Sequence, residues 1–273
     1  MKVFTHICLA VLLLGTTARA QTKNDSNSLR SVPVKQPVKH VVLKKPKPLH
    51  TELSFGLRLN TDGWGIFVDK GWVKSEDRYR DFFYDVKLLQ VELDEKKVPA
   101  EIKRSNTSAS YNNEKPKPFI YGKINNFYTF KIGYGGRKML AGKPEPGAIS
   151  MHFVYVGGLS LGLLKPYYLS VSAPTTEPDI TYSDSTKQYF LDKRYILGSS
   201  GFGKGLGETK IIPGVHLKAA MHFDFAANKA RVWALETGVN FEVYSKAIEI
   251  MANKDAKAYF LNAYLSLQFG KRW

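Results

Sequence analysis

Cysteine and long hydrophobic runs are the two features that this sequence has least of. Cys8 is the only cysteine in 273 residues, so the chain cannot form an internal disulfide or a site built from several cysteine ligands. No stretch reaches the ~18 consecutive apolar residues that a membrane helix needs, and no segment has the pattern of a convincing amphipathic helix. A chain without such helices can still enter a membrane as a closed barrel, which pairs all its backbone groups internally.

The start of the chain indicates export. Lys2 precedes a short apolar stretch over 7–14 and then Ala18-Arg19-Ala20, an order typical of a secretory signal peptide that is cleaved before Gln21. Cys8 lies inside the apolar stretch, so we expect no lipid anchor at the cleavage point. Residues 1–20 are therefore predicted to be a signal peptide, and the mature chain is expected to carry no cysteine.

A basic, proline-broken segment follows over 21–51. It holds seven lysines and arginines against one acidic residue, Asp25, a local excess of +6 within a total formal charge of +16. Such a composition predicts an extended linker. Because an exported chain rarely meets nucleic acid, we expect anionic lipid headgroups, lipopolysaccharide or an acidic periplasmic partner, with a solvated tether that has no partner as the alternative.

Alternation of apolar and polar residues dominates the rest of the chain, which we predict to be a barrel over 52–273. The clearest example is 215–225, where every second residue is apolar or small, as expected for a strand whose side chains alternate between two faces. The predicted strands are 53–60, 63–71, 79–93, 122–134, 151–163, 215–225, 231–243 and 259–273. An even number of strands fits a bacterial barrel. The predicted fold is all-β, an eight-stranded antiparallel up-and-down transmembrane β-barrel with an extended N-terminal tail.

The connections and the last strand indicate the orientation of this barrel. Long segments at 95–119, 164–208 and 246–256 alternate with shorter turns, so both termini are expected on the periplasmic side. In the last strand an apolar row from Tyr259 to Phe269 alternates with a mostly polar row, and the chain ends in an aromatic, Trp273. A soluble barrel of the lipocalin type is the structural alternative; it would bury the apolar rows and expose the charged ones.

The signal sequence, the eight alternating strands and the ending 265–273 together resemble the small outer-membrane β-barrel proteins of Bacteroidota (the outer membrane protein β-barrel domain family). The resemblance covers about 51–273. Lys271 departs from the pattern, in which an apolar residue is usual two positions before the end. The resemblance implies the bacterial outer membrane, with the N-terminal tail in the periplasm, and it implies no particular activity.

The polar rows predict a charged barrel interior. An eight-stranded barrel has a lumen just wide enough for side chains to fill, so we expect a network of ion pairs to plug it. The residues predicted for this lumenal charge network are Arg58, Asp81, Asp85, Lys123, Lys131, His152, His216, Lys218, His222, Glu236 and Glu242. Aromatic residues near predicted strand ends are expected to anchor the barrel at the membrane interfaces; these are Trp72, Tyr134, Trp233 and Trp273.

The most concentrated group lies on two consecutive strands. If Ala226 pairs with Ala230 around the turn, Glu236 lies opposite Ala220 and diagonal to both Lys218 and His222. A histidine beside a carboxylate can act as a general base or hold a metal, but a buried salt bridge is the simpler interpretation. We expect no catalytic residue, no metal and no cofactor. The one serine expected near a lumenal histidine is Ser150.

These observations predict a non-enzymatic outer-membrane barrel. We expect it to act as a structural or accessory subunit of an envelope complex, through its long external loop 164–208 and its basic tail 21–51. Two alternatives remain: a lipid- or lipopolysaccharide-modifying enzyme that uses His216, His222 and Glu236, and a narrow solute channel. The glycine-rich segment 201–207 lacks the strand and helix context of a phosphate loop and is expected to be an external loop.

Overall fold

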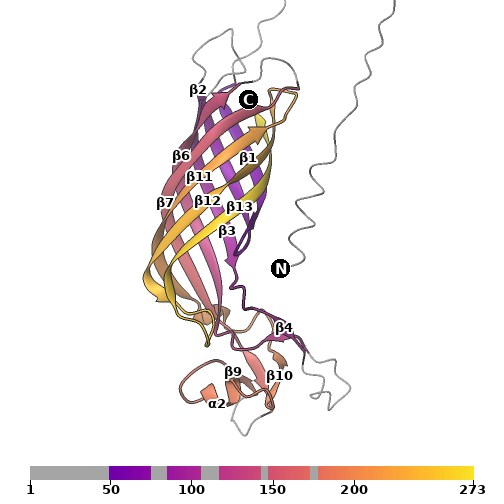
Figure 1. Ribbon diagram of the computed structural model, residues 1–273, viewed down its shortest axis with the longest axis vertical. Helices are drawn as coiled ribbons and strands as arrows, with labels where there is room; N and C mark the ends of the chain where they lie inside the picture. Colours follow the sequence, from indigo (N-terminus) through magenta and orange to yellow (C-terminus); the bar gives the residue numbers. More distant parts are fainter. Residues whose placement is uncertain (1–48, 75–84, 106–116, 143–146, 173–177) are drawn as a thin grey trace, which may run out of the picture. The chain divides into compact units, whose positions relative to one another are not determined.

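The computed structural model describes residues 49–74, 85–105, 117–142, 147–172 and 178–273. Eight long antiparallel strands form a closed barrel (Figure 1). They are β1 (Thr51–Asn60), β2 (Gly63–Lys74), β3 (Asp85–Lys96), β6 (Asn125–Ala141), β7 (Ser150–Pro166), β11 (Lys210–Asp224), β12 (Arg231–Ile248) and β13 (Lys257–Arg272). Around the barrel the order is β1-β13-β12-β11-β7-β6-β3-β2, so each long strand pairs with the ones before and after it, and β13 closes on β1.

This architecture confirms the predicted eight-stranded antiparallel up-and-down barrel. Several strands are longer than alternation indicated: β6 continues to Ala141, and β11 begins at Lys210. The alternation is hidden there by Gly135-Gly136 and by Pro213, which interrupt the pattern of side chains without interrupting the ladder. Residues 79–84 of the predicted third strand lie outside the described residues.

The barrel has its polar side chains inside and its apolar side chains outside. Leu261 is 69% exposed, whereas Arg58 is 1% exposed and Glu236 is fully buried. The outward apolar rows form a belt that includes Leu57, Val239 and Leu267. A soluble barrel of the lipocalin type has the opposite arrangement, since it buries its apolar rows. Among the described residues, no helix has the length and apolar character needed to cross a membrane.

The aromatic residues predicted as anchors all lie exposed on the outer surface. Trp72 pairs in register with Thr51, and the Trp273 backbone bonds to the same residue, so both lie at the end of the barrel where β1 begins and β13 ends, which we call the terminal end. Trp233 packs on Phe269 with 5.9 Å between ring centroids. Tyr134 lies within β6 rather than at its end, because that strand continues past the predicted boundary.

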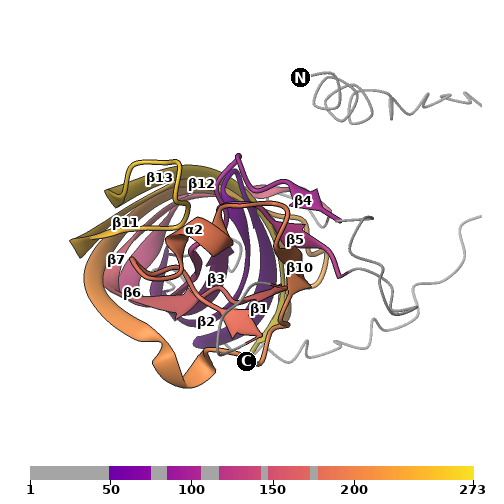
Figure 2. The same ribbon diagram turned by 90° about the horizontal axis from the view of Figure 1, so that it is seen from below.

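The opposite end, which we call the loop end, carries a small folded unit. It consists of β4 (Lys103–Arg104), β5 (Phe119–Ile120), β8 (Leu169–Val171), β9 (Asp179–Ile180), α2 (Lys187–Phe190) and β10 (Ile196–Ser199), followed by the short 3-10 helix η2 (Leu206–Glu208). We call the described residues of 103–121 and 167–200 the cap. Figure 2 shows α2 lying over the mouth of the barrel.

The cap has an apolar core of its own. Its buried side chains are Phe119, Leu169, Val171, Ile180, Phe190 and Ile196. Tyrosines such as Tyr121 and Tyr182 pack around this core, and the Tyr121 hydroxyl donates to the Leu191 carbonyl at 2.8 Å. The segment predicted as a long external loop therefore contains a three-stranded sheet, β10-β8-β9, and a helix.

Candidate functional site

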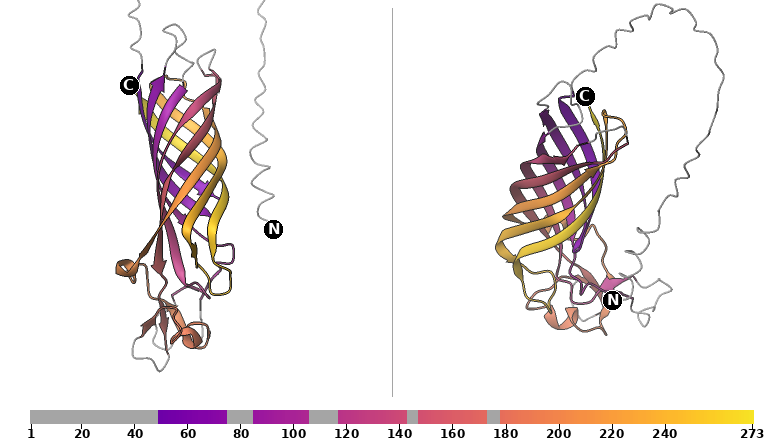
Figure 3. Two further views of the ribbon diagram at one scale, coloured as in Figure 1. Left: turned by 90° about the vertical axis from the view of Figure 1, so that its left-hand side faces the viewer. Right: turned by 45° about the horizontal axis from the view of Figure 1, so that its top comes forward.

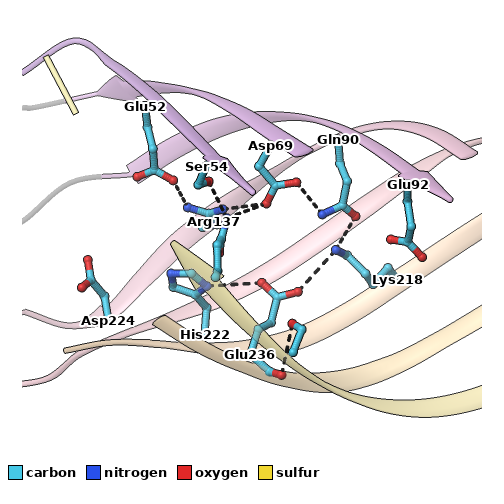
Figure 4. A network of polar contacts seen from close by, with 12 residues as sticks. Glu52, Ser54, Asp69, Gln90, Glu92, Arg137, Lys218, His222, Asp224 and Glu236 are labelled. Carbon is cyan, nitrogen blue, oxygen red and sulfur yellow. Dashed lines mark hydrogen bonds and ion pairs between the residues drawn. The ribbon is translucent and has the colours of Figure 1, made fainter. Parts of the chain in front are cut away.

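The lumen of the barrel holds a continuous network of buried charges. The half of this network near the start of β1 and the end of β13 is centred on Arg137 (Figure 4). Arg137 projects from β6 and forms ion pairs with Glu52 on β1 and with Asp69 on β2, the latter at 2.9 Å. Arg272 on β13 bonds to the other oxygen of Glu52 at 2.7 Å and to Asp224 at 2.7 Å. Five strands around the barrel, β6, β1, β2, β13 and β11, are thus connected through two guanidinium groups.

The middle of the network is centred on Glu236. Gln90 donates to Asp69 at 2.6 Å and accepts from the Lys218 ammonium. Lys218 in turn lies 3.3 Å from Glu236 Oε1, and His222 Nδ1 lies 3.3 Å from Glu236 Oε2. The Tyr264 hydroxyl also donates to Glu236, at 2.8 Å.

The half of the network nearest the loop end is centred on Glu92 and Glu242. Glu92 pairs with both Arg58 and Lys131, and Arg58 also reaches Glu236 at 3.7 Å, which joins this half to the middle. Lys131 and Lys96 each lie 3.1 Å from Glu242. Lys96 also pairs with Asp62 at the barrel rim, at 3.0 Å.

The opposing charges in the lumen nearly balance. Among the described residues that face the lumen, six buried cations meet seven buried carboxylates: Arg58, Lys96, Lys131, Arg137, Lys218 and Arg272 against Glu52, Asp69, Glu92, Asp94, Asp224, Glu236 and Glu242. Ionised groups removed from water are stable only when they are paired and hydrogen-bonded. Their mutual pairing explains how so many charges occupy one barrel interior.

An apolar cluster closes the lumen at the loop end. It contains Ile120, Phe127, Leu164, Ile212, Tyr244, Ile248, Ile250 and Met251. The ring of Phe127 meets that of Tyr244 edge-on at 5.4 Å between centroids. Lys123 lies beside this cluster and pairs with Glu101 at 2.5 Å, so it belongs to the mouth of the barrel rather than to the lumenal network in which it was predicted.

The structure brings most of the predicted network together and corrects it at two residues, Lys123 and Asp85. Arg58, Lys131, His152, His216, Lys218, His222, Glu236 and Glu242 are all buried inside the barrel. Asp85 is exposed on the outer face of β3, where it accepts a hydrogen bond from the Met139 backbone N–H. Asp81 lies outside the described residues.

The error at Asp85 arose from the phase of β3. The even-numbered residues of this strand, Gln90, Glu92 and Asp94 among them, are buried, and the odd-numbered ones face outward. Because side chains alternate with a period of two, a wrong choice of phase exchanges the two faces. Leu89, Val91 and Leu93 form the apolar row that could have indicated the correct phase.

The turn between β11 and β12 also differs from the expected one. Glu236 pairs directly with His222 in the ladder, rather than with Ala220. Relative to the expected pairing, the register of β12 against β11 is shifted by two residues, so that Asp224 lies opposite Ala234. Faces are unchanged by a shift of two, so Glu236 still contacts both Lys218 and His222.

Sequence reasoning missed several network residues for identifiable reasons. Glu52 and Arg137 lie just beyond predicted strand ends, and Arg272 continues the polar row of the last strand past Gln268 and Gly270. Extending each alternating pattern by one or two pairs would have found them. Lys96 ends β3, where the adjacent charges Asp94, Glu95 and Lys96 conceal the alternation.

A serine and a histidine meet in the lumen, but not the expected serine. Ser160 Oγ lies 3.1 Å from His216 Nδ1, whereas the sequence indicated Ser150. Ser160 is fully buried, and His216 packs against Gly133 on the inner wall. Within the described residues, no group of three or more histidine, cysteine or carboxylate side chains is arranged to hold a metal ion.

No protein-family model matches the sequence, and no curated protein matches it significantly. Among solved structures, Neisserial surface protein A (NspA) is similar, with 8% identity and a TM-score of 0.36 over 83% of this chain and 98% of that one. The attachment invasion locus protein Ail of Yersinia pestis, in complex with the heparin analogue sucrose octasulfate, has 8% identity and a TM-score of 0.35 over 83% and 100%. The N-terminal β-barrel domain of Pseudomonas aeruginosa OprF has 8% identity and a TM-score of 0.30 over 81% and 96%. Values this low identify no family, ligand or activity for the present chain.

Proposed function

We propose that this chain is a closed outer-membrane barrel that holds a folded external cap for binding, and that it serves as a structural or accessory subunit of an envelope complex. The observation that carries the proposal is the combination of a lumen filled by paired charges with an ordered cap at the loop end. Neither feature suits transport or catalysis. Both suit a rigid anchor that presents a surface to a partner.

The membrane location is supported by the outer surface of the barrel. Exposed leucines, valines and isoleucines cover several strands in succession, and a contiguous apolar surface of this extent is a liability in water. Each long strand has 10 to 18 residues, and about 9–11 residues of a tilted strand are enough to cross a bilayer. The predicted signal peptide and the resemblance to Bacteroidota barrels are consistent with an outer membrane in particular.

The same geometry argues against a channel. A conducting path would need a water-filled lumen, and here ion pairs occupy the lumen while the apolar cluster around Phe127 and Tyr244 covers its loop end. The purified barrel in a planar bilayer is therefore expected to show no ion conductance. Steady single-channel openings would overturn this part of the proposal.

Association with an envelope complex is tested by affinity purification of the full chain from native membranes. We expect a fixed partner to co-purify, and we expect its recovery to fall when the cap is destabilised or when residues 21–51 are deleted. The tail can contribute through its excess of positive charge, which attracts anionic lipids or an acidic protein. A protein that purifies alone from gentle detergent extracts contradicts the accessory role.

The enzymatic alternative has a separate test. His222→Ala removes the histidine that contacts Glu236. If the chain modified lipids with this pair, the variant would lose that activity while it still formed a barrel. We expect native membranes from the variant and from the unaltered chain to have the same lipid composition.

A further inference from the structure

The glycine-rich segment 201–207 has an ordered path on the side of the barrel rim. Its sequence is Gly201-Phe202-Gly203-Lys204-Gly205-Leu206-Gly207, and we call it the hook. In the left view of Figure 3, the orange chain and its short helix η2 project sideways beyond the barrel wall at the level of the rim. The same projection lies outside the ring of strands in Figure 2.

The hook contacts the outside of the barrel rather than its mouth. The Phe202 ring meets the Tyr128 ring edge-on, with 6.3 Å between centroids, and the Lys165 ammonium lies 4.9 Å from the Phe202 centroid. Tyr128 is on the same face of β6 as the outward residue Ile132. Phe202 thus packs on the outer wall at the loop end.

This contact makes the hook continuous with the apolar belt. Tyr128 pairs in register with Leu163, and Leu163 pairs with Ile211, which is exposed on β11. These three neighbours belong to the outward rows of three adjacent strands. Phe202 adds one more aromatic side chain to this surface at its loop-end edge, where the membrane boundary is expected.

The hook is held in place by its polar neighbours. Lys204 pairs with Asp179 of the cap at 3.0 Å, and the Ser200 hydroxyl donates to the same carboxylate at 2.8 Å. The Tyr168 hydroxyl donates to Glu208 at 2.6 Å. Gly205 has φ of 76°, and a Cβ at this position would lie 2.9 Å from the Tyr168 ring, so the close turn against Tyr168 requires glycine.

Two large apolar side chains of this fixed segment remain uncovered. Phe202 is 66% exposed and Leu206 is 53% exposed. Each is flanked by two glycines, which have no side chain to cover it. Both acidic groups near the hook, Asp179 and Glu208, already accept hydrogen bonds. The segment therefore presents apolar side chains beside lysines, a combination typical of elements that lie in a membrane interface.

We propose that the hook inserts into the outer leaflet of the membrane at the boundary between headgroups and acyl chains, with Phe202 and Leu206 among the lipids, and thereby seats the cap on the membrane surface. The occupant is lipid because the hook continues the lipid-facing belt without a break. The proposal rests on the membrane location given under the proposed function. It adds a second, lateral contact with the membrane, made by the hook rather than by the barrel strands.

The test uses single cysteines, which the chain allows because Cys8 can be replaced by serine without touching the barrel. Phe202→Cys and Leu206→Cys are each labelled with an environment-sensitive fluorophore, and the full-length protein is reconstituted into vesicles of phosphatidylcholine and phosphatidylglycerol. Lipids with a nitroxide at a shallow or a deep position of the acyl chain then quench the label according to its depth. We expect both hook labels to emit at a shorter wavelength than in water and to be quenched more by the shallow nitroxide.

Labels at two control positions distinguish a failure of the hook proposal from a failure of the proposed membrane location. Leu217→Cys lies in the middle of the outward row of β11 and should be quenched most by the deep nitroxide; Lys193→Cys on the cap should be quenched by neither. If both hook labels behave like the label at 193 while the label at 217 is quenched, the hook proposal is wrong and the barrel still spans the membrane. If the label at 217 is also unquenched, the membrane location itself fails. Heat-modifiable migration on a gel shows that each labelled variant has formed the barrel.

Discussion

Arg137 on β6 bonds to Asp69 on β2 across the lumen, although β3 separates these strands in the barrel. The same carboxylate oxygen accepts a hydrogen bond from Gln268 on β13, at 2.9 Å. Asp69 on β2 therefore joins its own strand to both β6 and β13. The interaction connects strands that the backbone ladder does not join, so it stabilises the closed cross-section of the barrel rather than any one hairpin.

Removal of this guanidinium is expected to destabilise the barrel strongly. Arg137→Ala leaves Glu52 and Asp69 buried without their main counter-charge, and breaking a buried pair in this way costs about 3–5 kcal/mol. Denaturant unfolding in detergent, followed by gel migration, measures the loss. Arg194→Ala is the matched control, since the pair between Arg194 and Asp192 is exposed on the cap. Equal unfolding midpoints for the two variants would contradict a structural role for the network.

The two faces of β3 should respond differently to the loss of a carboxylate. Glu92→Ala removes a buried carboxylate that pairs with both Arg58 and Lys131 and is expected to lower the free energy of unfolding by about 3 kcal/mol. Asp85→Ala removes one hydrogen bond to the Met139 backbone on the outer face, worth about 1 kcal/mol. Denaturant unfolding of both variants in the same detergent tests the corrected phase of this strand. A larger effect at Asp85 than at Glu92 would restore the phase first expected.

The cap is expected to unfold without the barrel. Phe190 is fully buried in the cap core, and Phe190→Ala removes enough packing to cost about 3–5 kcal/mol. Proteolysis should then cleave within 178–200, while the barrel keeps its heat-modifiable migration. Lys187→Ala, on the exposed side of the same short helix, should leave the cap resistant. Loss of the barrel in Phe190→Ala would show that the two parts fold as one unit.

Acid should release the hook from the cap. Hydrogen bonds from Ser170, aided by Ser200 and Lys204, hold the pKa of Asp179 below its usual value, which is about 3.9 in unfolded chains. A lowered pKa in the folded state means that the ionised carboxylate stabilises the cap fully above the unfolded value. This stabilisation decreases as the pH falls below about 3.9 and is lost below the folded pKa.

Resistance of the cap to an acid-active protease at low pH, and to trypsin at neutral pH, measures this change. Asp179→Asn should make the cap easier to cleave at neutral pH, and it should remove the loss of protease resistance that protonation of Asp179 causes in acid. Asp184→Asn, at an exposed position, should change neither result. An unchanged acid profile in Asp179→Asn would show that other groups control the stability of the cap.

Much of the barrel could be read from alternation alone. The eight strands were predicted because a strand with one lipid-like and one polar face leaves a period of two in the sequence, as in Val215 to Phe225. The lumenal positions of Lys218, His222 and Glu236 followed from the same period. The phase of β3 and the turn at Asn228 did not, because a strand with charges on both faces and a turn of uncertain length each allow two solutions.

The sequence by itself determined the architecture: closed β-structure, an apolar outer surface and a charged interior follow from residue periodicity, which local chemistry imposes on every strand. Tertiary structure alone decided which charges pair. Arg137 meets Asp69, and Arg58 meets Glu236, only because barrel closure and shear bring distant strands to the same height. It also decided that the described residues of 167–200 form a cap with a core and that Phe202 packs on Tyr128. Those contacts depend on packing between segments far apart in the chain, for which sequence periodicity holds no signal.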